Sequence, residues 1–247
     1  MKFNLVPAAA ACAAAFFMAT PGEAQTDLIE VDVELVLAVD ISHSVDEEEA
    51  RRQREGYVAA LASPEVIDAI QGGPWGRIAV TYVEWADARL QRPAADWALI
   101  DSEEAALAFA AQVAAAPLEK GSYTAIGSAI DDAVTRIETN AYSAPRMIID
   151  ISGDGPQNQG MPLEVARARA DEAGITVNGL PVITEGQTLM RAEINLAGYF
   201  QDNVVTGPSS FVLPARTEEE FRQAILRKLV LEIAGAEPSP VELGLLP

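Results

Sequence analysis

The sequence predicts an α/β fold: a doubly wound, mostly parallel central sheet with one antiparallel edge strand and helices on both faces. The apolar stretches at 35–39 and 146–152 are typical of strands buried on both faces of a sheet. Strand-like and helix-like segments alternate along the chain, which indicates parallel strands joined by right-handed crossovers. The 247 residues, 49% of them hydrophobic with a mean hydropathy of +0.11, provide material for one large domain.

The elements can be placed from periodicity and turn residues. A turn near Asp87 is followed by an extended piece, and this spacing predicts an antiparallel edge hairpin. The expected strands cover 31–42, 77–86, 90–100, 146–152 and 175–182, with a short one at 211–213. The expected helices cover 46–71 with a bend at Pro64, 101–116, 125–140, 162–173, 189–200 and 217–233.

The first residues have the composition of a targeting segment. Lys2 is the only early charge, an Ala-rich apolar stretch covers 6–20, and Gly22 and Ala24 supply small residues at a cleavage site. We therefore expect residues 1–24 to be a signal peptide, and the protein to be exported to the periplasm or secreted.

The remaining chain is expected to form one domain over 25–235, followed by a flexible, proline-containing tail over 236–247. Cys12 is the only cysteine and lies in the leader, so the mature chain would have no thiol. Lipidation of Cys12 is an alternative to cleavage after Ala24. No stretch approaches the roughly 20 apolar residues of a membrane span, so we expect none.

The charge of the chain restricts its partners. The formal net charge is −20 and the pI is near 4.3. Repulsion from phosphates argues against nucleic acid and anionic membrane surfaces, whereas cations are the natural complement.

Polar residues with oxygen side chains follow two of the predicted core strands and open one predicted helix. Each has an ordinary structural role open to it: Ser44 fits a capping box, Thr124 could cap the helix after it, and Asp154-Gly155 could be a turn. In an open α/β sheet, however, these loops meet at the carboxyl edge of the strands, where ligands bind. The residues concerned are Asp40, Ser42, Ser44, Thr124 and Asp154.

This pattern resembles the von Willebrand factor type A (vWA) domain with its metal-ion-dependent adhesion site (MIDAS). The family motif is Asp-x-Ser-x-Ser with a later Thr and a later Asp, and all five positions are matched here. The resemblance covers roughly residues 31–233 and includes the glycine-rich approach to Thr124 over 121–127. His43 and the Ser152-Gly153 pair depart from the usual residues, but neither change removes an oxygen ligand.

The donor set indicates which metal would bind. Hydroxyl and carboxylate oxygens suit a hard cation such as Mg²⁺, with Mn²⁺ or Ca²⁺ as alternatives. A zinc site is not expected, because one His and no mature Cys cannot supply that ion's usual nitrogen and sulfur ligands.

The resemblance implies a non-enzymatic, exported module that binds a protein partner through the metal. Two predicted helix amino ends near the site favour an incoming anion, so the partner is expected to offer an Asp or Glu. The alternative is a Mg²⁺-dependent hydrolase or phosphotransferase with Asp40 as nucleophile. Such enzymes need a second acid two residues later, and that position is Ser42.

Overall fold

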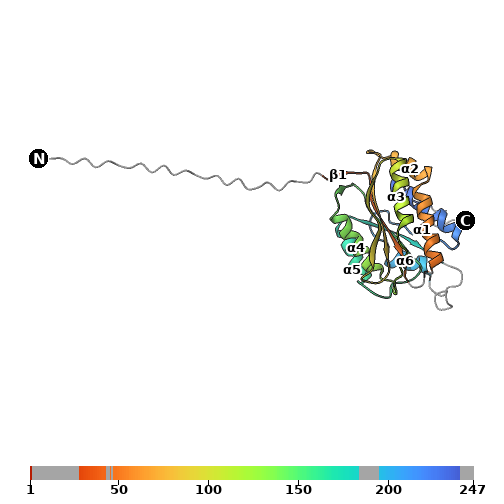
Figure 1. Cartoon of the computed structure of the whole chain (residues 1–247). Helices are drawn as coiled ribbons and strands as arrows, with labels where there is room; N and C mark the ends of the chain where they lie inside the picture. Colours follow the sequence, from red (N-terminus) through yellow and green to blue (C-terminus); the bar gives the residue numbers. More distant parts are fainter. Residues whose placement is uncertain (2–27, 43–44, 46, 184–194, 240–247) are drawn as a thin grey trace.

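The computed structural model describes residues 1, 28–42, 45, 47–183 and 195–239. Its centre is a five-stranded sheet in the order β4-β3-β2-β6-β7, with helices on both faces (Figure 1). Parallel pairing joins β2 (Glu34–Asp40), β3 (Ile78–Trp85), β6 (Met147–Gly153) and β7 (Thr176–Pro181), while β4 (Gln91–Ile100) runs antiparallel to β3 at the edge. The predicted fold class and the antiparallel edge strand are therefore confirmed.

Strand β2 lies at the middle of this sheet and all seven of its residues are buried. Leu35 and Leu37 point into the core on one face, whereas Val36 and Ala38 point into the core on the other. An unbroken apolar run is needed here because neither face of the strand meets water. The parallel register places Asp40 opposite Trp85, and Val39 opposite Ser152. The carboxyl ends of three strands therefore meet at one edge.

One face of the sheet is covered by α1 (Glu47–Leu61), α2 (Pro64–Gln71), α3 (Glu103–Ala115) and α7 (Glu218–Ala234) (Figure 1). The single bent helix expected over 46–71 is two helices. The chain breaks because the Ser63 hydroxyl accepts a hydrogen bond from the Val66 amide at 3.3 Å, and Pro64 occupies the first position of the new helix.

The other face is covered by α4 (Ile126–Glu138), α5 (Leu163–Glu172) and α6 (Leu196–Asn203). The helix predicted over 189–200 is observed as α6. It begins later than expected, at Leu196. The N-cap is Asn195, whose side chain accepts a hydrogen bond from the Gly198 amide. Residues 189–194 of that prediction lie outside the described part of the chain.

Two short pieces differ from expectation. β1 (Ile29–Glu30) pairs in parallel with β5 (Tyr142–Ser143), a pairing that two-residue segments cannot reveal by periodicity. The strand predicted over 211–213 is only an isolated bridge between Val212 and Gly179. Within the described ranges, no helix has the length and apolar character needed to cross a bilayer.

Candidate metal site

Four of the five predicted ligands lie at the carboxyl edge of the sheet. Asp40 ends β2, Ser42 follows two residues later, Thr124 comes just before α4, and Asp154 comes directly after β6. Their exposed fractions are 1%, 1%, 2% and 2%. Ser44, the fifth, lies outside the described residues. The fold therefore buries carboxylate and hydroxyl oxygens at one edge.

Asp40 has a carboxylate that the protein only half satisfies. Its Oδ1 accepts a hydrogen bond from the Ser42 amide at 2.7 Å, while Oδ2 is buried and has no hydrogen-bond partner in the described part of the chain. Burial, followed by the nearby charge of Asp154, raises the pKa of Asp40 to about 8, although the Ser42 amide and hydroxyl and the Asp154 amide act in the opposite direction. A cation between the two acids would lower both the cost of burying the Asp40 carboxylate and its repulsion from Asp154.

The loop that carries Thr124 is fastened to the ends of both neighbouring strands. The Gly121 amide donates to the Ile41 carbonyl at 3.1 Å, and the Ala125 amide donates to the Ala86 carbonyl at 2.8 Å. A Cβ at Gly121 would overlap the Cβ of Ala86, so only glycine fits this approach. The glycine of the predicted motif thus serves to bring Thr124 to the edge.

Thr124 is not used as a helix cap. The residue at the N-cap of α4 is Ala125, which has no side-chain cap hydrogen bond. The Gly127 amide in the first turn is satisfied by Gln157 Oε1 at 2.7 Å. The capping role that the sequence left open for Thr124 is therefore filled by the Gln157 side chain.

A run of amide side chains after β6 holds the site's loops together, and sequence reasoning missed it. Asn158 Oδ1 accepts a hydrogen bond from the Thr124 backbone amide, and the Asn158 backbone amide donates to the Thr124 carbonyl, both at 2.9 Å. Gln159 Oε1 accepts from the Ala88 amide at 2.9 Å, in the turn between β3 and β4. The available signal is the Gln-Asn-Gln run over 157–159, because amide side chains can pair with both backbone donors and acceptors.

The donor chemistry fits a hard cation better than a soft one. Among the residues that the structure describes, no group of three or more His, Cys, Asp and Glu side chains is placed to hold a metal. The candidate site has only two carboxylates, and the rest of its oxygens are hydroxyls. Gly153 leaves room above Asp40, since a Cβ there would lie 3.2 Å from Oδ2.

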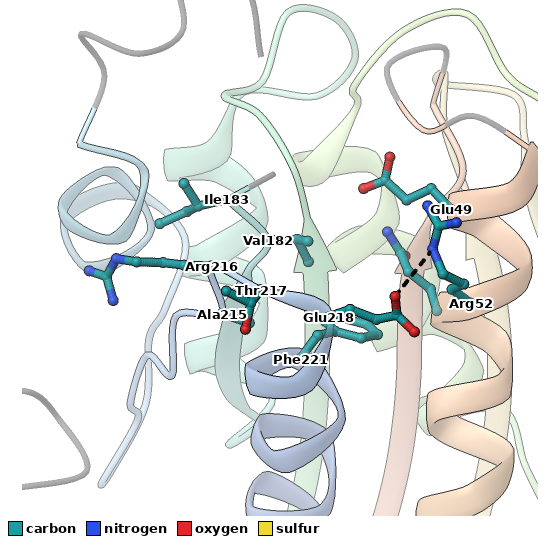
Figure 2. Close-up of a pocket in the computed structure, with 10 residues that line it drawn as sticks. Glu49, Arg52, Val182, Ile183, Ala215, Arg216, Thr217, Glu218 and Phe221 are labelled. Atoms are coloured by element: carbon teal, nitrogen blue, oxygen red, sulfur yellow. Dashed lines mark ion pairs between the residues drawn. The ribbon is translucent and has the colours of Figure 1, made fainter. Parts of the chain in front are cut away.

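A pocket of about 300 Å³ lies beside this site, between α1, the end of β7 and the start of α7 (Figure 2). Val182 and Phe221 give it apolar walls, and an ion pair between Arg52 and Glu218, 4.0 Å apart, crosses its rim. The carboxyl edge of the sheet thus combines an oxygen-rich site with a neighbouring apolar hollow.

Similar solved structures identify the fold as that of a vWA domain. Proximal thread matrix protein 1 from the mussel byssus matches at 15% identity and a TM-score of 0.60 over 84% of this chain and 49% of that one. The von Willebrand factor domain of the pili tip protein Mfa5 from Porphyromonas gingivalis matches at 11% and 0.56, over 85% and 97%. A von Willebrand factor type A structure from Catenulispora acidiphila matches at 16% and 0.52, over 83% and 43%.

The predicted resemblance to vWA domains is confirmed at the level of the fold. The chain spans about half the length of the mussel protein, another structure of which has a zinc-occupied MIDAS motif. A family model described as "Protein of unknown function (DUF1194)" matches residues 30–237, and the chain belongs to that family. A search of curated proteins found no match.

Proposed function

We propose that this chain is an exported, non-enzymatic module that binds a protein partner through a divalent metal ion. Asp40, Ser42, Ser44, Thr124 and Asp154 would hold the ion, and residues 1–24 would be the signal peptide of a domain over 25–235. The observation that carries the proposal is the half-satisfied Asp40 carboxylate, buried beside a second carboxylate at the ligand-binding edge of a vWA fold.

Mg²⁺ is the proposed ion, with Mn²⁺ and Ca²⁺ as alternatives, because the donors are hard oxygen atoms. Zinc is included as a comparison, since a similar structure carries zinc in this motif. The ion would act as a Lewis acid to which an oxygen ligand of the partner coordinates.

We further propose that the partner supplies an Asp or Glu. The two carboxylates balance a divalent ion formally, and the hydroxyl ligands add no charge. The exposed rim of the carboxyl edge carries cations beside acids: Arg89 follows Asp87 on the turn after β3, and Lys120 follows Glu119 four residues before Thr124. Between Lys120 and Thr124, Tyr123 is 50% exposed and offers an aromatic contact surface. An acidic segment would meet this rim despite the −20 charge of the whole chain.

A phosphotransfer role for Asp40 is less well supported. The position of the required general acid is Ser42, whose backbone amide binds Asp40 Oδ1. A hydroxyl at that position cannot donate and retrieve a proton near neutral pH as a carboxyl group does.

The decisive experiment uses the mature protein as bait for an envelope fraction, in Mg²⁺ and in chelator, beside an Asp40→Asn bait. Proteins that require the metal should be retained by the wild type in Mg²⁺ and lost in both other conditions. The partner's acids are then changed to amides one at a time, and one change should reduce Mg²⁺-dependent affinity at least tenfold, about 1.4 kcal/mol. Retention of the same proteins under all conditions would refute metal-mediated binding.

A further inference from the structure

Three charged side chains are fully buried between α7 and the sheet, away from the candidate metal site. Lys228 of α7 lies 2.7 Å from Asp150 Oδ1 of β6 and pairs with Glu232 one turn further along α7. All three side chains have 0% exposure. One ammonium group therefore faces two carboxylates, and the fully ionised cluster would carry an uncompensated negative charge in the core.

The surrounding groups do not supply a second cation to the carboxylates. Asn178 Nδ2 of β7 donates to Glu232 Oε1 at 2.8 Å, and Oε2 is buried without a hydrogen-bond partner in the described chain. Tyr57 of α1 and Tyr82 of β3 face the cluster, and burial raises the phenolic pKa of both well above its usual value, so both are neutral. Arg146 is nearby but donates to the carbonyls of Glu232 and Ile233, both at 2.6 Å, at the end of α7.

The cluster borders a pocket through which it can exchange protons with solvent. This pocket, of about 340 Å³, opens at the amino edge of β6 and β7, opposite the candidate metal site. Asn178 and Glu232 line it, together with Arg146, Phe211 and the exposed Glu237. A polar cavity of this size can hold several waters.

We propose that the carboxyl groups of Asp150 and Glu232 share one proton beside the Lys228 ammonium group. Loss of this proton loosens α7 from the sheet. With the proton, the cluster is neutral and each acid is stabilised by the same ammonium group. Without the proton, one buried carboxylate lacks a counter-ion. Movement of α7 toward water lowers the free-energy cost of that buried charge. The device is a pH-sensitive lock on one helix.

The electrostatics agree with this geometry and determine the sign of the pH dependence of stability. Burial raises the pKa of Glu232 to about 7 and also raises that of Asp150, although Lys228 acts in the opposite direction on both. The folded protein therefore binds a proton that the unfolded chain has already released. Stability from this group is present at low pH and is lost as pH rises through about 7.

Loosening would act on the whole helix. α7 is 17 residues long, and its first turn lines the pocket beside the candidate metal site (Figure 2). It packs closely on α1, where a Cβ at Gly56 would lie 3.1 Å from Ile225 Cδ1, and Phe221 contacts Tyr57 with ring centroids 6.4 Å apart. Hydrogen exchange along α7 can therefore report the state of the lock.

The test compares the wild type, Glu232→Gln and Glu237→Gln between pH 5 and 9 in chelator, by hydrogen exchange and urea unfolding. After correction for intrinsic exchange, α7 amides of the wild type should lose protection by up to tenfold per pH unit between pH 5 and 7, and the loss should level off above that range. Glu232→Gln should abolish this dependence, and Glu237→Gln, at the rim of the same pocket, should keep it. Amides of α4 serve as an internal reference.

Asp40 also has a raised pKa, so its contribution to global unfolding is common to all three proteins and cancels in the comparison. If Glu232→Gln folds poorly, the carboxyl carbon shift of Glu232 in the wild type gives an independent reading and should titrate near pH 7. Titration below pH 5, or equal pH dependence of α7 protection in the wild type and Glu232→Gln, would overturn the proposal.

Discussion

Two buried acid pairs depend on the same strand, β6, and they differ in where their positive charge comes from. Asp150, in the strand, faces Glu232 with Lys228 between them. Asp154, just after the strand, lies near Asp40, and Oδ2 of Asp40 is buried without a hydrogen-bond partner in the described part of the chain. The first pair is compensated by Lys228, whereas we propose that a bound cation compensates the second. The comparison teaches that the burial of two acids does not by itself indicate a metal site, because a cation of the chain can compensate them.

The largest expected effect comes from removing the internal cation. Lys228→Met leaves two carboxylates in the core and should destabilise the protein by roughly 3–5 kcal/mol at pH 8 in urea unfolding. The loss should shrink at pH 5, because both acids can then be protonated. Arg227→Met removes the same charge from the exposed side of α7 and should change stability by about 0.5 kcal/mol or less. Similar losses for the two variants would remove the distinction between the pairs.

The next effect tests the external cation. Mg²⁺ at about 100 times its Kd should stabilise the wild type by roughly 2.7 kcal/mol, and Asp40→Asn should abolish this gain. Glu34→Gln is the matched control, because Glu34 is also buried and stands at the other end of β2. In chelator at pH 9, Asp40→Asn should be at least as stable as the wild type, since it removes a costly buried charge. Equal stabilisation of Asp40→Asn and the wild type by Mg²⁺ would refute the site.

The affinity for Mg²⁺ should depend on pH with a defined sign. Because the pKa of Asp40 is raised to about 8, a proton competes with the metal at neutral pH. Affinity should therefore rise by up to tenfold per pH unit between pH 6 and 8 and level off above that range. Calorimetric titrations at each pH measure this, and an affinity that is flat across the range would contradict the role of Asp40.

The fold was predictable where one segment carries its own signal, and less so where contacts between segments decide. The apolar run of β2 predicts by itself a strand buried on both faces, and the Gly121 loop predicts by itself the approach to Thr124. Pro64 indicated a bend, but whether two helices form depends on how each packs. Asn158 and Gln157 act through partners 30 or more residues earlier in the chain. Lys228 and Glu232 look like an exposed i,i+4 pair, and only the orientation of α7 buries them.

The smallest effect concerns a single hydroxyl ligand. Thr124→Val keeps the branched shape and removes only the oxygen, so Mg²⁺ affinity should fall by about tenfold, or 1.4 kcal/mol. Helix stability should hardly change, because Ala125 is the N-cap of α4 and Asn158 holds the Thr124 backbone. Thr124→Ser retains the hydroxyl and should restore most of the affinity, although it loses the same methyl contacts that alanine would. Full affinity in Thr124→Val together with a loss in Thr124→Ser, measured by calorimetry, would show that Thr124 acts through packing and not as a metal ligand.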